Sequence, residues 1–177
     1  MKTTRKFLLA LAFLGIVGLV ASCTKEDNNS LFSMSNQDFI TQAASSNLFE
    51  VAAGNLAVQK SGNANVKAYG EHMKTDHTQA TTEMSTLANQ KGWSIPTSML
   101  KKHQDKIDAL TALTGVEFDR QYAMMMVVSH QETIALFESA ARDSGVPDYD
   151  LRIMAAGKLP TLKEHLQHAQ QLQTQVQ

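Results

Sequence analysis

The feature that most constrains the fold is the spacing of apolar residues between Val66 and Ala88. In this stretch small or apolar residues recur at alternating steps of four and three, as they do on the buried face of an α-helix. One polar residue, His77, stands in the middle of that face, which otherwise consists of Val66, Gly70, Met73, Ala80, Met84 and Leu87. The pattern therefore predicts a long helix with a histidine on its buried face.

The same helical spacing recurs along most of the chain. It predicts long helices over residues 35–61, 64–91, 116–142 and 149–175, and a shorter helix over 99–113. Residues that favour helix ends mark several of these boundaries: Ser35 with Asp38 three positions later, Asn63, Gly92 and Asp148. No segment alternates apolar and polar residues as a strand would, so we expect one all-α domain over residues 35–177.

The lengths of the connections predict how the helices are arranged. The connections at 62–63 and 143–148 are short, so each joins two helices into an antiparallel hairpin. The connection over 92–115 is longer and carries the short helix, so the second and third long helices are not simple antiparallel neighbours. The expected fold is a ferritin-like four-helix bundle, made of two hairpins joined by a crossover.

The N-terminus has the pattern of an export signal. Lys2, Arg5 and Lys6 precede the uncharged run 7–21, which is too short for a stop-transfer span. The run ends in Leu-Val-Ala-Ser-Cys, which resembles the lipobox of bacterial lipoproteins, with Cys23 as the acylated residue. Cys23 is the only cysteine, so an internal disulfide is excluded. The alternative is an ordinary secretory cleavage site beside an unrelated thiol.

Acylation of Cys23 would anchor the protein to a membrane without a spanning helix. Residues 1–22 are then a signal peptide, and residues 23–34 a flexible polar tether. Thr24 follows the cysteine, where inner-membrane lipoproteins have a retaining aspartate, and residues 25–27 resemble an export signal of surface lipoproteins. We therefore expect an outer-membrane lipoprotein that faces the periplasm or the cell surface.

The charge of the chain argues against one class of partner. Removal of residues 1–22 takes the formal net charge from −1 to −4, because Lys2, Arg5 and Lys6 leave with them. A mildly acidic chain with dispersed charges is unlike a nucleic-acid-binding protein. The membrane, reached through the lipid anchor, is the partner that the sequence predicts.

Four polar residues fall on the buried faces of the long helices, one from each. They are Glu50, His77, His130 and His165. Counted from the turn of its hairpin at 1.5 Å per residue, each lies level with its hairpin partner to within about one helical turn. We therefore expect one polar layer across the bundle, whereas His72, His103 and His168 are expected in solvent.

A buried carboxylate beside three imidazoles suits a first-row divalent ion such as Zn²⁺, Fe²⁺ or Mn²⁺. Asp76, just outside the buried face, is either a further ligand or a residue that orients an imidazole. The consecutive methionines 124–126 point in different directions and are better explained as core, so copper is less favoured. The alternative is a metal-free cluster in which Glu50 and the histidines bond to one another.

These residues also carry a resemblance to a known family. Glu50, the pair Asp76–His77, His130, and Leu159–Pro160 followed by His165 recur in it, as do Glu117, Phe118, Asp119 and Tyr122. The family is a bacterial domain of unknown function with a ferritin-like fold, often labelled an outer-membrane protein, and the resemblance covers residues 38–170. It implies the fold and the polar layer but no activity.

The sequence leaves three hypotheses for function. The first is an envelope lipoprotein that binds or senses a transition metal. The second is a structural or interaction module of the cell envelope with a metal-free histidine core. The third is a metalloenzyme. In the ferritin-like di-iron enzymes a glutamate stands three residues before a metal-binding histidine, but no glutamate stands there before any of the three buried histidines. We expect binding rather than catalysis.

Overall fold

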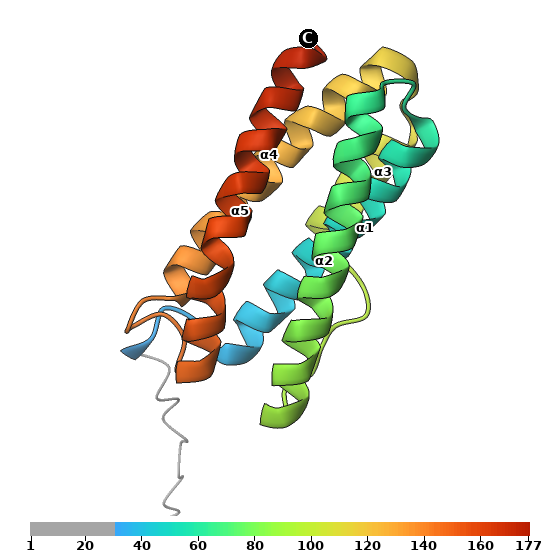
Figure 1. Ribbon diagram of the computed structural model, residues 1–177. Coiled ribbons are helices and arrows are strands. Elements are labelled where there is room, and N and C mark those ends of the chain that lie inside the picture. The colour runs from blue at the N-terminus through green and yellow to red at the C-terminus, as the bar shows by residue number, and fades with distance from the viewer. Residues whose placement is uncertain (1–30) are drawn as a thin grey trace, which may run out of the picture.

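The computed structural model describes residues 31–177, which contain five α-helices and no strand within that range. Figure 1 shows the helices lying along one another as a bundle. Their bounds are α1 Asn36–Lys60, α2 Ala64–Lys91, α3 Lys101–Thr111, α4 Gly115–Ala140 and α5 Tyr149–Gln175. The all-α prediction is confirmed for these residues, and every predicted helix is present to within two residues at each end. The predicted signal peptide and Cys23 lie outside the described residues.

The ends of the helices form as their capping residues predict. The Ser35 side chain accepts a hydrogen bond from the Asp38 amide, and the Asn63 side chain accepts bonds from the first turn of α2. Asp148 caps α5 through the Leu151 amide. Gly92 ends α2 with a φ of 72°, in the left-handed region that glycine enters without steric strain.

The helices pack in the pairs that the connection lengths predict. α1 packs mainly against α2, and α4 against α5, while α1 also contacts α4 and α2 also contacts α5. The short helix α3 lies in the crossover and packs on α1 and α4. None of the helices between residues 31 and 177 combines the length and apolar character needed to cross a bilayer.

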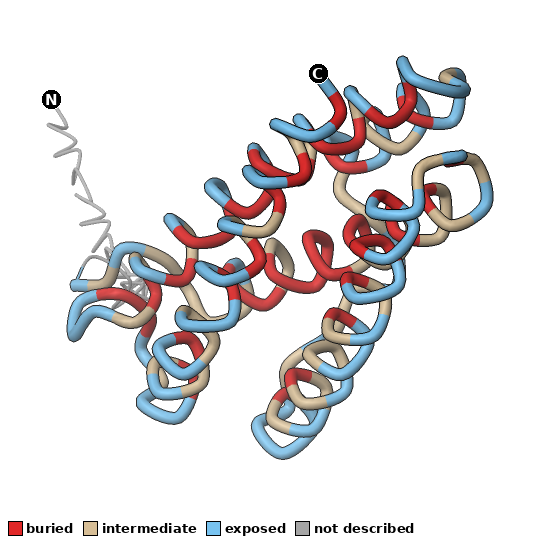
Figure 2. Tube along the Cα trace, turned by 45° about the horizontal axis from the view of Figure 1, so that its top comes forward, coloured by how far each residue is buried: buried red, intermediate tan, exposed pale blue. Residues whose placement is uncertain are grey.

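The buried face of the bundle is divided into two apolar clusters. Figure 2 shows buried positions recurring on the sides of the helices that face one another. One group, here called the Phe49 cluster, includes Phe49, Met73, Tyr122, Met126 and Ala169. The other, the Phe39 cluster, includes Phe39, Met84, Ile134, Phe137 and Leu162. On α2, α4 and α5 a buried histidine stands between a residue of one cluster and a residue of the other, so a polar layer separates the two.

Two expectations need correction. His103 is buried, not solvated: its Nδ1 lies 2.6 Å from the Ser45 hydroxyl, and its ring stacks on Phe49 with centroids 5.7 Å apart. Burial lowers its pKa to about 4. The end of the expected tether is also attached to the domain, because the amides of Ser33 and Met34 donate to the carbonyls of Ser144 and Gly145.

Candidate metal centre

Three histidines from three helices meet between the apolar clusters. His77 comes from α2, His130 from α4 and His165 from α5. Their ring centroids are 5.8 Å apart for His77 and His130, 5.5 Å for His77 and His165, and 5.4 Å for His130 and His165. Their exposures are only 4%, 1% and 2%. Each imidazole is therefore held in the interior with the other two as neighbours.

Two of the rings are oriented by groups that accept hydrogen bonds. Nδ1 of His77 lies 2.9 Å from the amide oxygen of Asn47 on α1. Nδ1 of His130 lies 2.8 Å from the carbonyl oxygen of Met126, one turn earlier on the same helix. Because an oxygen of this kind only accepts, Nδ1 carries the proton in both rings. Nε2 of each ring then holds an unshared electron pair.

The third ring is turned the other way. Nε2 of His165 lies 2.9 Å from Oδ2 of Asp76 and donates to it, so the unshared pair is on Nδ1. A carboxylate that accepts from the far nitrogen of a histidine is the usual second partner of a metal-bound imidazole. Asp76 thus has the orienting role that was one of its two predicted roles.

The three nitrogens left with unshared pairs have no partner of their own. Nε2 of His77, Nε2 of His130 and Nδ1 of His165 are buried and lack a hydrogen bond from any residue in 31–177. The histidines offer ligand atoms that all lie within 4.8 Å of one another. Nitrogens bound to one tetrahedral ion at about 2.1 Å lie roughly 3.4 Å apart, so a small inward rotation of the rings would suffice. The donor set fits a metal ion.

Burial also sets the charge of the three rings. It lowers the pKa of His130 to about 4, and that of His165 to about 4 despite the opposing hydrogen bond to Asp76. The pKa of His77 is lowered well below its usual value by burial and by the neighbouring histidines. At neutral pH all three are uncharged, which is the form that binds metals.

Glu50 does not join the three histidines, although the sequence placed it in their layer. Its Oε1 accepts a hydrogen bond of 2.5 Å from the Ser129 hydroxyl, and it belongs to neither cluster of metal-ligating atoms found among the described residues. Burial raises its pKa to about 8. Burial raises the pKa values of Tyr69 and Tyr122, and the nearby carboxyl group of Glu50 raises them further. Glu50 therefore lies on the side of the Phe49 cluster.

Asn47 takes the place on α1 that the sequence assigned to Glu50. It lies three residues earlier and is also buried, so both residues face the interior. Sequence reasoning missed Asn47 because an amide is not a common metal ligand. Its position on the same helical face was the available signal.

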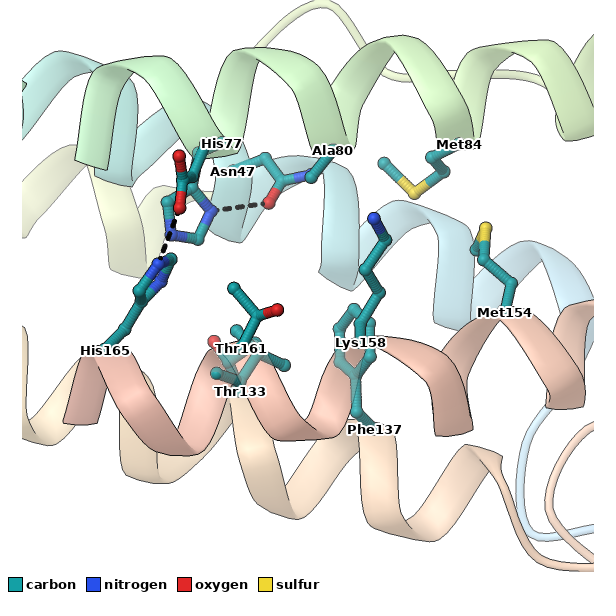
Figure 3. A pocket seen from close by; sticks show the side chains of 12 residues that line it. Asn47, His77, Ala80, Met84, Thr133, Phe137, Met154, Lys158, Thr161 and His165 are labelled. Atoms are coloured by element: carbon teal, nitrogen blue, oxygen red, sulfur yellow. Dashed lines mark hydrogen bonds and ion pairs between the residues drawn. The ribbon is translucent and has the colours of Figure 1, made fainter. Parts of the chain in front are cut away.

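A cavity of about 60 Å³ adjoins the site, enough for more than one water molecule. Figure 3 shows His77 and His165 at one end of this cavity and Met84 and Met154 at the other. The Lys158 side chain lines it between these ends and forms an ion pair with Glu83. The space lies beside two of the three histidines.

The fold and the site define a class of protein: a helical bundle with a buried cluster of three neutral histidines. The chain belongs to the DUF4142 family, a domain of unknown function whose model matches residues 21–172. This agrees with the resemblance to a domain of unknown function noted from the sequence.

Two further comparisons describe the relatives. No sequence among the curated proteins matches this chain. A solved structure described as CopM in the Cu(II)-bound form is similar, with a TM-score of 0.64 and 17% identity, over 80% of this chain and 97% of that one. At this identity the likeness shows a shared helical fold.

Proposed function

We propose that this protein binds a divalent transition-metal ion through Nε2 of His77, Nε2 of His130 and Nδ1 of His165. The observation that carries the proposal is that three buried histidines from three helices each leave one ring nitrogen without a partner and offer ligand atoms within 4.8 Å of one another. A buried polar atom without a partner is destabilising unless a ligand or water satisfies it. A metal ion would satisfy all three at once.

The donor set narrows the choice of metal. Without Glu50 the ligands are three imidazole nitrogens, which suit Zn²⁺, Cu²⁺ and Fe²⁺ better than Mn²⁺. From the sequence copper was less favoured, because the methionines that would suit it are better explained as core residues. The Cu(II)-bound form of the structural neighbour gives a further reason to test copper first beside zinc.

The surroundings favour metal binding over a metal-free histidine core. A metal-free histidine core would pair the imidazoles with one another, whereas here each uses its protonated nitrogen on a different group and leaves the other free. The cavity beside His77 and His165 offers room for a water or small ligand on the ion. Three protein ligands with one open position also occur in catalytic zinc sites, so a metalloenzyme is the second candidate.

The cellular setting that we propose follows the sequence. The protein is an outer-membrane lipoprotein anchored through Cys23, facing the periplasm or the cell surface, and its bundle has ferritin-like connectivity. The ion-binding layer would then lie in a domain held close to the membrane by a short tether. Labelling with a radioactive fatty acid tests the anchor: the label should enter the wild type and be absent from Cys23→Ser.

Metal analysis tests the site. After loading with Zn²⁺ or Cu²⁺ and dialysis, His77→Ala and His130→Ala should each bind one ion per chain fewer than the wild type. Glu50→Gln is the matched control, because it changes a buried polar residue outside the histidine cluster, and it should retain the wild-type metal content. Equal metal content in all four proteins would refute the proposal.

A further inference from the structure

A second cluster of ligand atoms lies on the solvent side of the buried histidines. His72 and Asp76 are one turn apart on α2, with Nε2 of His72 3.1 Å from Oδ2 of Asp76. Together with His165 they form a group whose ligand atoms all lie within 4.8 Å of one another. Asp76 Oδ2 therefore faces two histidines, one exposed and one buried.

A third histidine stands beside this group. His168 lies one turn after His165 on α5, and its ring centroid is 6.3 Å from that of His72. Two imidazoles on one ion have ring centres roughly 5 to 6 Å apart, given metal–nitrogen distances of about 2.1 Å. His72 and His168 both line an open hollow on the surface between α2 and α5. The separation of the two ring centres is therefore close to that of two imidazoles on one ion.

The group is open to solvent, unlike the buried cluster. The His72 side chain is 42% exposed and that of Asp76 is 32% exposed, against 3% for the His165 side chain. The carboxylate of Asp76 and the imidazoles of His72 and His168 are ligand types that divalent zinc and copper accept, and His72 and Asp76 lie one turn apart on α2. A solvent-exposed pair of His72 and Asp76 alone would not account for His168, which comes from a second helix, α5.

We propose that His72, Asp76 and His168 form a second, solvent-facing site for a divalent transition metal, and that metal reaches the buried histidines through it. The existence of the outer site is independent of the function proposed above, whereas the loading role depends on it. His165 links the two sites, because its Nε2 faces Asp76 and its Nδ1 faces the buried cluster. An ion that moves from the outer site to the buried histidines would pass this imidazole.

Binding of Zn²⁺ to the full chain, measured by equilibrium dialysis, tests the outer site. The wild type should bind two ions, and the double variant His72→Gln/His168→Gln should bind one. Glu71→Gln is the matched control, since it removes an exposed carboxylate from the neighbouring position and should leave two ions bound. If the double variant binds as many ions as the wild type, the outer site is refuted.

The rate of loading tests the transfer role. In stopped-flow mixing with Zn²⁺ and a chromophoric chelator, the double variant should fill its remaining site at least tenfold more slowly than the wild type and Glu71→Gln. An unchanged rate would refute the loading role. The variant His77→Ala/His130→Ala separates the two proposals: it should keep the outer ion and bind one ion fewer than the wild type. If it binds as many ions as the wild type, the buried site fails while the outer site stands.

Discussion

Asp76 on α2 accepts a hydrogen bond of 2.9 Å from Nε2 of His165 on α5, across the interface of the two hairpins. This bond decides which nitrogen of His165 carries the proton. With the proton held on Nε2, Nδ1 keeps its electron pair and is left buried without a partner, in a ring that neighbours His77 and His130. A residue outside the buried cluster thus sets the chemistry inside it.

Replacement of Asp76 by asparagine should weaken metal binding at the buried site without unfolding the protein. The amide oxygen accepts a weaker hydrogen bond than a carboxylate, so His165 becomes a poorer ligand, and loss of such a partner lowers metal affinity by about 10- to 100-fold. Competition titration with a chelator measures the affinity, and it is made in the His72→Gln/His168→Gln background so that only the buried site is read. Asp105→Asn, which changes a surface aspartate paired with Lys101, is the control and should bind like the wild type. Equal affinities would show that the hydrogen bond does not tune the site.

Acid should destabilise the metal-free protein over the range between pH 6.5 and about 4. His130 and His165 have folded pKa values of about 4 against an ordinary value of 6.5, so the unfolded chain binds more protons in this range. The free energy of unfolding therefore falls as pH drops, and each such group contributes a slope of about 1.4 kcal/mol per pH unit. Denaturant titrations at several pH values, with a chelator present, measure this slope. His130→Ala should reduce it, and an unchanged slope would contradict the assignment.

Glu50 should act on stability in the opposite sense and should leave metal content unchanged. Its folded pKa of about 8 lies above the ordinary value of 4.5, so the folded chain binds more protons and stability is lost as pH rises from 4.5 to 8. Glu50→Gln removes that loss and should stabilise the protein by about 4 kcal/mol at pH 7.5. Chemical denaturation and metal analysis of the same samples give both readouts. A loss of metal would restore Glu50 as a ligand.

Periodicity and caps were enough to predict the helices and three members of the polar layer. A histidine among apolar residues at helical spacing must face the core, whatever the rest of the fold. The depth along the helix is less certain: Asn47 and Glu50 lie on the same face of α1, and only the way in which α1 packs decides that Asn47 meets His77. Counting residues from a turn cannot resolve a shift of three positions.

His103 shows a second limit of the sequence. Its neighbours on α3 are mostly charged, which favours solvent, but α3 packs on α1 and α4 and turns this one ring toward Ser45 and Phe49. A short helix with few apolar residues does not reveal its buried side by composition. The contacts that orient His77 and His165 are tertiary, and of these two partners the sequence pointed only to Asp76, which stands next to His77.

Close approach of α1 and α2 at Gly54 and Gly70 should be required for both stability and metal binding. A Cβ at residue 54 would lie 2.6 Å from the Gly70 carbonyl oxygen, and one at residue 70 would lie 2.9 Å from the Gly54 carbonyl oxygen. Because these neighbours are backbone, the helices themselves must separate, which would draw His77 away from Asn47. Gly54→Ala or Gly70→Ala should therefore lower the free energy of unfolding by about 1 to 3 kcal/mol and weaken metal binding.

Gly157→Ala on α5 is the matched control for these variants. No atom lies within 4 Å of a Cβ at residue 157, and glycine within a helix is less favourable than alanine, so this change should stabilise the protein by about 0.5 to 1 kcal/mol. Thermal melts and chelator competition on all three variants measure both effects. If Gly54→Ala and Gly70→Ala behave like Gly157→Ala, α1 and α2 can accommodate an added Cβ at their contact, and that contact does not position His77.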